Sequence, residues 1–186
     1  MEMTTNQQDS AQGEAAAPPF AEGGNGGVQV LKFGLPTEEE LPMLAQLYAV
    51  HVTTKATSPM EAAFEETQAR EMLEKFMRLR ERIQVARVDG HVLGFVTIEP
   101  DGPVRRAAYL RHLVVKPECR RQGVGTSLLK RAHHMALEMS RKSLILRVDP
   151  SNENLVAFVR KAGFMTVGAL SSKKSGKLRL LMSCEL

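Results

Sequence analysis

The sequence lacks tryptophan, has only two cysteines, and contains no hydrophobic segment of membrane-spanning length. Aromatic residues make up 5% of the chain, so few side chains are available for stacking on nucleic-acid bases. Cys119 and Cys184 lie far apart without CxxC spacing, which argues against a zinc site and a disulfide framework. No basic-then-apolar leader opens the chain. These absences predict a cytoplasmic protein with no metal site and no membrane partner.

Charge is distributed unevenly, although the net formal charge is only +4. Residues 1–100 contain 8 basic and 15 acidic side chains, whereas residues 101–186 contain 17 basic and 6 acidic ones. A basic C-terminal half suits a polyanionic cofactor, and it would also suit a nucleic acid. Because stacking side chains are scarce, a nucleic acid is the less favoured of these two partners.

The segment from Tyr109 to Leu129 contains three successive patterns, which are typical of a strand, a turn and a helix. A β-branched apolar run over residues 110–115 predicts a buried strand that ends at Pro117, because proline has no backbone donor for a sheet. The turn Arg120-Arg121-Gln122-Gly123-Val124-Gly125 follows. Apolar residues at helical spacing then predict a helix with one buried face, formed by Leu128, Leu129, Ala132, Met135, Ala136 and Met139.

This sequence of strand, glycine-containing turn and helix predicts an anion-binding site. The first N–H groups of a helix lack internal partners and lie at its positive dipole end. Arg120 and Arg121 on the approach favour a phosphate or pyrophosphate. The alternative is that the glycines only turn the chain and the arginines are solvated. Neither GxGxxG nor GxxxxGK[ST] occurs, which excludes two commoner phosphate-binding loops.

The motif Arg120-x-x-Gly123-x-Gly125 resembles the [QR]-x-x-G-x-[GA] signature of the GNAT superfamily of acetyl-CoA-dependent N-acetyltransferases. A second block further along the chain strengthens this resemblance: a strand over residues 144–148, then Asn154 and Ala157, then Gly163-Phe164. The resemblance covers residues 28–186 and defines the expected acetyltransferase domain. Residues 1–27 are rich in Gly, Ala, Gln, Ser and Pro, and they predict a disordered tail or linker.

The order of the predicted elements implies an α+β protein, and the resemblance implies the GNAT-like fold. We expect a central mixed, mostly antiparallel sheet of about seven strands, with about four helices on its two faces. Thr37 and Glu40 form a predicted capping box before the first helix, and a second helix is expected over residues 58–82. Asp89-Gly90 is expected to join strands 83–88 and 91–99 in a hairpin.

The resemblance implies that acetyl-CoA is the cosubstrate and that the loop binds its pyrophosphate. The backbone of Leu113 and Val115 would then hold the thioester end, and Asn154 the pantetheine, unless Asn154 is a helix N-cap. The residues nominated for the pyrophosphate are Arg120, Arg121, Gln122, Gly123, Val124, Gly125 and Thr126.

The acceptor amine must lose a proton, and the sequence offers two candidates for this step. Tyr109 stands fourteen residues before Gly123, where family members often carry Glu or His. A tyrosine with its pKa near 10 is a poor base but can orient an amine or a water, unless it is simply a packed aromatic. Glu99 is the second candidate, acting through water, unless it is a solvated strand end. Regular alternation would place Tyr109 on the face of Arg111, Leu113 and Val115, opposite His112, which is therefore discounted.

Many relatives carry a tyrosine that protonates the departing thiolate, and Val159 occupies that place here. The leading hypothesis is an N-acetyltransferase acting on a primary amine of a small molecule, peptide or protein. The alternatives are a CoA-binding regulatory module with little or no catalysis and, less favoured, a nucleic-acid-binding protein. Nothing in the residues identifies the acceptor or decides between a monomer and a homodimer.

Overall fold

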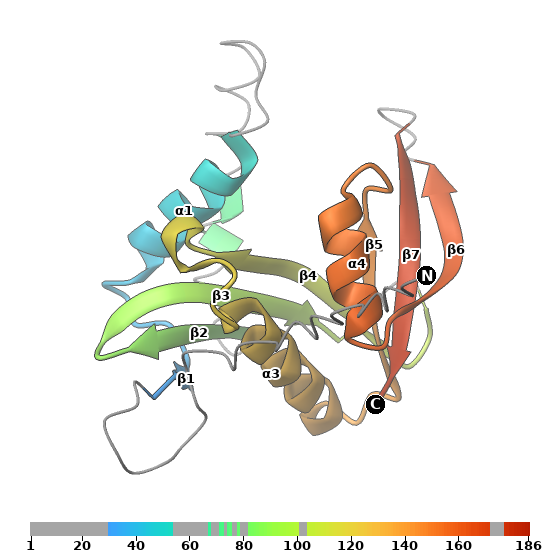
Figure 1. Cartoon of the computed structure of the whole chain (residues 1–186). Helices are drawn as coiled ribbons and strands as arrows, with labels where there is room; N and C mark the ends of the chain where they lie inside the picture. Colours follow the sequence, from blue (N-terminus) through green and yellow to red (C-terminus); the bar gives the residue numbers. More distant parts are fainter. Residues whose placement is uncertain are drawn as a thin grey trace, which may run out of the picture.

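The computed structural model describes residues 30–53, 67, 71–72, 74–75, 78, 82–100, 104–171 and 177–186. Seven strands form one mixed sheet in the order β1-β2-β3-β4-β5-β7-β6 (Figure 1). The strands are β1 Lys32–Gly34, β2 Ile83–Val88, β3 His91–Glu99, β4 Ala107–Val115, β5 Ser143–Val148, β6 Met165–Ser171 and β7 Leu178–Glu185. The helices are α1 Leu41–Thr53, α3 Val124–Glu138 and α4 Glu153–Lys161, with a short 3-10 helix η2 at Pro117–Cys119.

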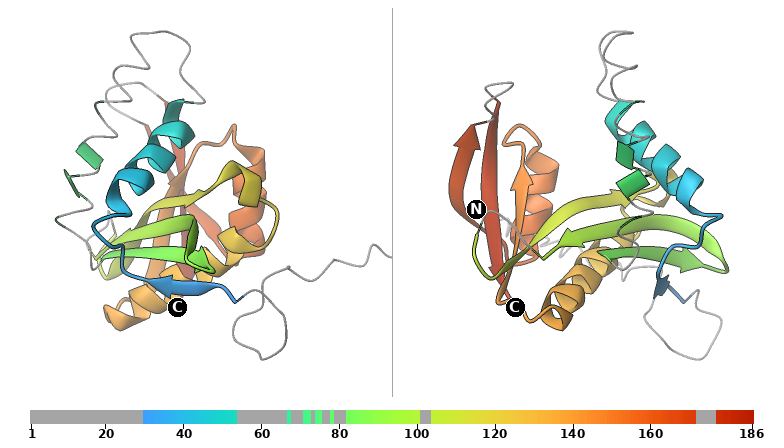
Figure 2. Two further views of the ribbon diagram at one scale, coloured as in Figure 1. Left: turned by 90° about the vertical axis from the view of Figure 1, so that its left-hand side faces the viewer. Right: turned by 180° about the vertical axis from the view of Figure 1, so that it is seen from behind.

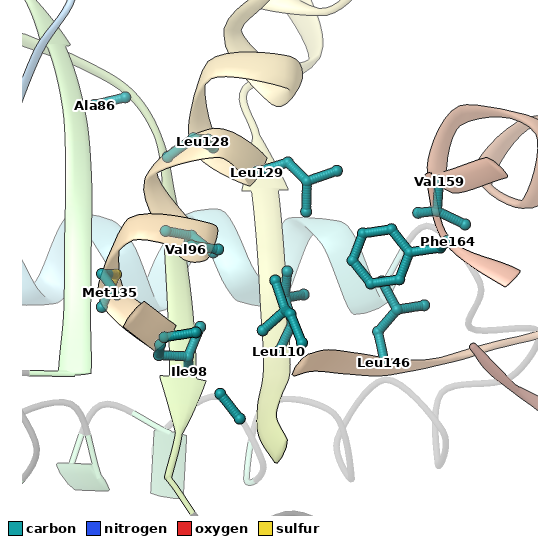
Figure 3. Packing of buried hydrophobic residues seen from close by; sticks show 14 of the residues in the cluster. Ala86, Val96, Ile98, Leu110, Leu128, Leu129, Met135, Leu146, Val159 and Phe164 are labelled. Atoms are coloured by element: carbon teal, nitrogen blue, oxygen red, sulfur yellow. The ribbon is translucent and has the colours of Figure 1, made fainter. Parts of the chain in front are cut away.

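Helices cover both faces of this sheet, as the element order predicted. On one face α1 packs against β2, β3 and β4 through a buried cluster of Leu41, Leu44, Leu47, Ile83, Val85, Val92, Phe95 and Val114. On the opposite face α3 and α4 share a larger cluster (Figure 3), which includes Val96, Ile98, Leu110, Leu128, Leu129, Met135, Leu146, Val159, Phe164 and Met182. The mixed sheet and its two helical layers confirm the predicted α+β class.

Backbone geometry confirms the predicted hairpin turn and shows how α4 ends. Asp89 and Gly90, between β2 and β3, have φ values of 48° and 80°. Positive φ at both central residues is the geometry of a type I′ turn, which matches the twist of paired strands. Gly163, just after α4, has φ 90°, and the next N–H, that of Phe164, donates to the Val159 carbonyl. Both turns therefore form where the sequence placed a residue that tolerates positive φ.

The first helix begins later than its capping signal suggests. The N–H of Thr37 donates to Glu40 Oε2 at 2.8 Å, which is one half of the predicted capping box. However, residues 38–40 form a turn, and α1 starts at Leu41. Glu40 also binds Arg87 Nε at 2.6 Å, and this contact is the main reason that the pKa of Glu40 is lowered. Glu40 thus ties the start of α1 to strand β2.

Two predicted segments lie wholly or largely outside the described residues. They are the tail at 1–27 and the helix expected over 58–82. Residues 67, 71, 72, 74, 75 and 78 within the last segment are described, and all six are helical. None of the described helices is both long enough and apolar enough to cross a membrane.

Strands β4 and β5 stay together over a very short distance. They pair in parallel at only three positions, from Ala107 opposite Ser143 to Tyr109 opposite Ile145. Beyond Tyr109 the two strands diverge, and the sheet opens into two arms (Figures 1 and 2). One arm is β1 to β4, and the other is β5, β7 and β6. The backbone groups of β4 beyond residue 109 therefore have no partner in β5.

Strand β4 contains a β-bulge at Arg111. Thr97 of β3 pairs with His112, whereas the next residue, Ile98, pairs with Leu110, so Arg111 is an extra residue. Glu99 pairs with Tyr109, and Glu99 and Thr97 lie on one face of β3 because they are two residues apart. Tyr109 and His112 consequently share a face of the sheet.

The predicted orientation of β4 is therefore wrong. Leu113 and Val115 pack against the cluster of α3 and α4, on the face opposite Tyr109 and His112. The prediction failed because it assumed unbroken alternation, and the bulge shifts the alternation by one residue. His112 cannot be discounted on grounds of orientation.

The packing at Gly94 provides a test of how tightly β3 and β4 are held together. A Cβ on Gly94 would lie 2.4 Å from the carbonyl oxygen of Val114 and 3.1 Å from the Cα of Val115, both backbone atoms. Neither strand can yield easily, so Gly94→Ala should destabilise the protein by about 1 to 3 kcal/mol. Gly168→Ala is the matched control, because a Cβ on that strand glycine has no heavy atom within 4 Å among the described residues. Equal denaturant midpoints for the two variants would contradict the close contact.

Candidate active site

The divergence of β4 and β5 creates an open-sided cleft with a cavity volume of about 190 Å³. Its walls come from β4, β5, α3 and α4, and it is lined by Leu110, Arg111, His112, Leu113, Val114, Leu129, Leu146, Arg147, Val148, Leu155, Phe158 and Val159. The cleft thus cuts through the sheet from the face of α3 and α4 toward the face of α1.

The N-terminus of α3 lies at one end of this cleft. Gly123 is the N-cap residue with φ 85°, and no side chain caps the helix. The first helical hydrogen bond runs from the N–H of Ser127 to the Gly123 carbonyl at 3.0 Å. The preceding N–H groups, those of Val124, Gly125 and Thr126, have no carbonyl within the helix to bind. Since the first turn carries no acidic side chain, these groups can receive an anion.

Gly125 connects the helix terminus with the cleft. Its φ is not positive, so the backbone does not require glycine here. A Cβ on Gly125 would lie 3.7 Å from the Phe158 ring, 3.8 Å from Val115 and 3.9 Å from Leu113. All three are cleft residues or their strand neighbours. The missing side chain therefore leaves space where the N–H groups of α3 meet the cleft.

The cleft edge of β4 exposes backbone groups of Leu113 and Val115. The N–H of Lys116 donates to the Leu93 carbonyl of β3 at 2.9 Å, and successive residues direct their backbone groups to opposite edges of a strand. The backbone groups of Val115 and Leu113 therefore point away from β3, toward β5. Arg120 Nε donates to the Val115 carbonyl at 3.3 Å, which brings this arginine to the same edge.

The remaining nominated loop residues differ in exposure and in the groups that they can present to a ligand. Arg121 is exposed and has φ 62°, and Gln122 donates its side-chain amide to the Glu118 carbonyl at 3.0 Å. Thr126 is exposed beside the helix terminus. The side chain of Val124 is fully buried in the core, so only its backbone N–H can face a ligand.

Asn154 does not cap α4. The N-cap is Asn152, whose side chain accepts a hydrogen bond from the N–H of Leu155 at 3.1 Å. Asn154 is exposed in the first turn of the helix. The alternative that made Asn154 a helix cap is therefore wrong, because the helix starts two residues earlier than that alternative requires.

The wall of the cleft formed by α4 is apolar. Val159 is 2% exposed, and it lines the cleft together with Leu155 and Phe158. Figure 3 shows Val159 and Phe164 facing Leu146 of β5. No hydroxyl group comes from this side of the cleft, in agreement with the unusual valine noted in the sequence.

A second, smaller pocket adjoins the cleft on the face of α1. Arg111 and His112 line both cavities, and Glu99, Thr97, Lys75 and Arg82 are among the other residues lining the second. Glu99 binds Lys75 Nζ at 2.7 Å and lies 3.5 Å from the Arg111 guanidinium. Its side chain is 20% exposed, so Glu99 is not a solvated strand end.

His112 lies in this smaller pocket. Its Nδ1 is 2.9 Å from the hydroxyl of Thr97, and its ring meets the ring of Tyr48 edge-on, with centroids 5.0 Å apart. Sequence reasoning missed this residue, since alternation along the strand gave no sign of the bulge. The one signal in favour of His112 was its residue type, an imidazole on the strand that approaches the loop.

Tyr109 lies on the same face, at the point where β4 and β5 separate. Burial raises its pKa, and the nearby cations Arg147 and Arg111 act in the opposite direction. The guanidinium of Arg147 lies 5.6 Å from the centroid of the Tyr109 ring. The hydroxyl of Tyr109 thus remains protonated at neutral pH and can donate a hydrogen bond but cannot accept a proton.

The fold agrees with that of known acetyltransferases of low sequence identity. The chain superposes with a TM-score of 0.66 on Ard1 from Thermoplasma volcanium, at 20% identity over 84% of this chain and 97% of that one. It superposes with a TM-score of 0.65 on the PaiA N-acetyltransferase of Thermoplasma acidophilum, whose structure contains coenzyme A. The identity is 18%, over 84% of this chain and 99% of that one. The TM-score is 0.64 for the ribosomal-protein-alanine N-acetyltransferase of Brucella melitensis, at 24% identity over 83% of this chain and 99% of that one.

A family comparison of the sequence itself agrees with this fold. The matched segment, residues 47–164, runs from within α1 through β2 to β5 and ends just after α4, so it contains the cleft and the N-terminus of α3. The sequence model that matches is the one described as Acetyltransferase (GNAT) family, and the protein belongs to this family of acetyltransferases.

Proposed function

We propose that the protein transfers the acetyl group of acetyl-CoA to a primary amine. The observation that supports this most directly is the continuity of the N–H groups of α3, the open position at Gly125 and the cleft between β4 and β5. A polyanionic head with a long thin arm fits such a path better than a compact ligand does. The match to the family and to a relative containing coenzyme A supports the same cosubstrate.

In this proposal the pyrophosphate binds the N–H groups of Val124, Gly125 and Thr126, with Arg121 as a charge partner. The pantetheine arm runs through the cleft along the exposed backbone of Leu113 and Val115. The acetyl group then lies near the bulge, where the cleft meets the smaller pocket lined by Arg111 and His112. The amine approaches from the face of α1.

The reaction forms one bond and breaks one bond at the acetyl carbon. The neutral amine attacks the thioester carbonyl, and an N–H of β4 stabilises the negative oxygen of the tetrahedral intermediate. This intermediate collapses as the C–S bond breaks and the CoA thiolate leaves. One proton passes from the nitrogen to a base, and one proton reaches the thiolate. Because the α4 wall is apolar, that second proton comes from water, which suffices for a thiol with a pKa near 8.5.

We assign the role of base to His112 and a hydrogen-bonding role to Tyr109. Imidazole exchanges protons most readily near neutral pH, and the Thr97 hydroxyl fixes the orientation of the His112 ring. Tyr109 remains protonated and can orient the amine or a water molecule. Glu99 binds Lys75 and Arg111, and it positions these cations beside the reacting groups.

Cofactor binding is tested by Gly125→Glu. A negative side chain in the open position would repel phosphates and fill the path, so affinity for acetyl-CoA should collapse. Gly168→Glu is the matched control, with the same charge change at an open strand position. At one hundred times the dissociation constant, acetyl-CoA should stabilise the parent by about 2.7 kcal/mol and raise its Tm by about 5 to 10 °C. The Gly125 variant should show no such shift, whereas equal shifts in both variants would exclude this site.

The assignment of the base is tested by His112→Gln. This change should lower kcat by about a hundredfold and remove the acid limb of the pH–rate profile, while CoA binding persists. Tyr109→Phe should lower kcat by no more than about tenfold and keep the shape of the profile, since its hydroxyl does not titrate in this range. An unchanged pH profile in His112→Gln would move the role of base to Glu99.

Turnover itself separates an enzyme from a CoA-binding regulatory module. A panel of primary amines is incubated with acetyl-CoA, and free thiol and acetylated amine are measured together. Sustained, stoichiometric release of both products supports the proposed function. Tight binding of CoA without acetylation of any amine would instead favour the regulatory module.

A further inference from the structure

Two arginines flank the point where β4 and β5 diverge. Tyr109 and Ile145 form the last pair of the two strands, and Arg147 lies two residues beyond Ile145, on the same face as Tyr109. The position of its guanidinium over the Tyr109 ring agrees with this placement. On the opposite arm, the bulged Arg111 is directed to Glu99, which also shares the face of Tyr109. Each arm therefore carries one guanidinium at the mouth of the cleft.

This face is not the face of the cofactor loop. Gly125 and the N-terminus of α3 adjoin Leu113, Val115 and Phe158, which belong to the side of α3 and α4. The two arginines belong to the side of α1, where His112 and Tyr48 also lie. A ligand that contacts both arginines therefore enters the cleft between β4 and β5 from the side opposite the pyrophosphate site.

The described side chains around this mouth carry a net positive charge. Lys75, Arg82 and Arg111 line the smaller pocket, and Glu99 is the one carboxylate among the described residues that line it. Glu99 contacts Lys75 and Arg111, and its single negative charge offsets only one of the three positive charges. Arg147 makes no ion pair with any residue that the structure describes. A positively charged amine alone would be repelled here, whereas a molecule with an additional anionic group would be attracted.

We propose that the acceptor carries a carboxylate close to its amine, and that Arg111 and Arg147 bind this carboxylate from the two arms of the sheet. The planar guanidinium presents paired donors that match the two oxygens of a carboxylate. Glu99 holds Arg111 in place, and the Tyr109 ring supports Arg147. The amine beside the carboxylate then lies near Tyr109 and His112. This inference rests on the proposed acetyl transfer and specifies its substrate class.

The test compares pairs of amines that differ only in the carboxylate. One arm uses lysine against cadaverine and phenylalanine against phenethylamine. A second arm uses peptides with a free N-terminus followed by Asp or Glu, against the same peptides with Asn or Gln. In at least one of these two substrate series, the parent should acetylate the carboxylated member with a kcat/KM at least tenfold higher, mainly because its KM is lower. The series that shows this preference identifies a free amino acid or an acidic peptide as the source of the carboxylate.

Arg147→Gln and Arg111→Gln should reduce this preference at least fivefold, and Arg147→Lys should restore part of it because the charge is retained. Arg105→Gln is the matched control, since Arg105 is exposed and lines neither cavity. The pH profile for the carboxylated amine should keep its shape in the arginine variants, unlike in His112→Gln. A preference that survives in both glutamine variants would overturn the assignment of these arginines.

Failure of this inference can be distinguished from failure of the proposed function. Equal kcat/KM values within every pair would disprove the carboxylate preference and leave acetyl transfer intact. If no amine is acetylated, the proposed function fails, and calorimetry with CoA present decides the inference separately. An N-acetyl amino acid should then bind at least tenfold more tightly than its uncharged amide. Equal affinities would overturn the carboxylate site.

Discussion

The three-residue pairing between β4 and β5 is the constraint on which the rest of the site depends. If the strands remained paired beyond Tyr109 and Ile145, the backbone groups of Leu113 and Val115 would be satisfied within the sheet. Their separation leaves these groups without a strand partner, with Arg120 donating to the Val115 carbonyl, and opens the cleft beside the N-terminus of α3. A buried strand edge without partners is costly unless a ligand or water satisfies it. The fold therefore stabilises an opening through the sheet by packing α3 and α4 around it.

The bulge at Arg111 shifts the alternation of side chains between the two faces of β4. Before the bulge, Leu110 faces the core of α3 and α4 and Tyr109 faces α1. After it, Leu113 and Val115 turn toward the cleft while His112 moves to the face of Tyr109. One strand thus presents an apolar, backbone-rich edge on one side and titratable side chains on the other. Bulges commonly redirect side chains beside functional sites in this way.

Most of the fold could be predicted because its signals are local. The Asp89-Gly90 turn, the periodic apolar residues of α3 and the glycine after α4 each impose their conformation over a few residues. The position of the loop was predictable for the same reason. The bulge was not, since it depends on how β3 and β4 align across the sheet. Arg147 was also missed, because its proximity to Tyr109 arises from the pairing of distant strands.

The insertion of β7 between β5 and β6 has a consequence for how this arm assembles. Strand β7 is the last of the three in the chain, yet it lies between the other two. It pairs with β5 along one edge and with β6 along the other. During synthesis, β5 and β6 must therefore both wait for a segment that leaves the ribosome after them. In that interval β6 presents Met165 and Val167, which remain 69% and 56% exposed even in the folded protein. Until β7 has been synthesised, the edges of β5 and β6 that it will cover are therefore unpaired and open to premature association.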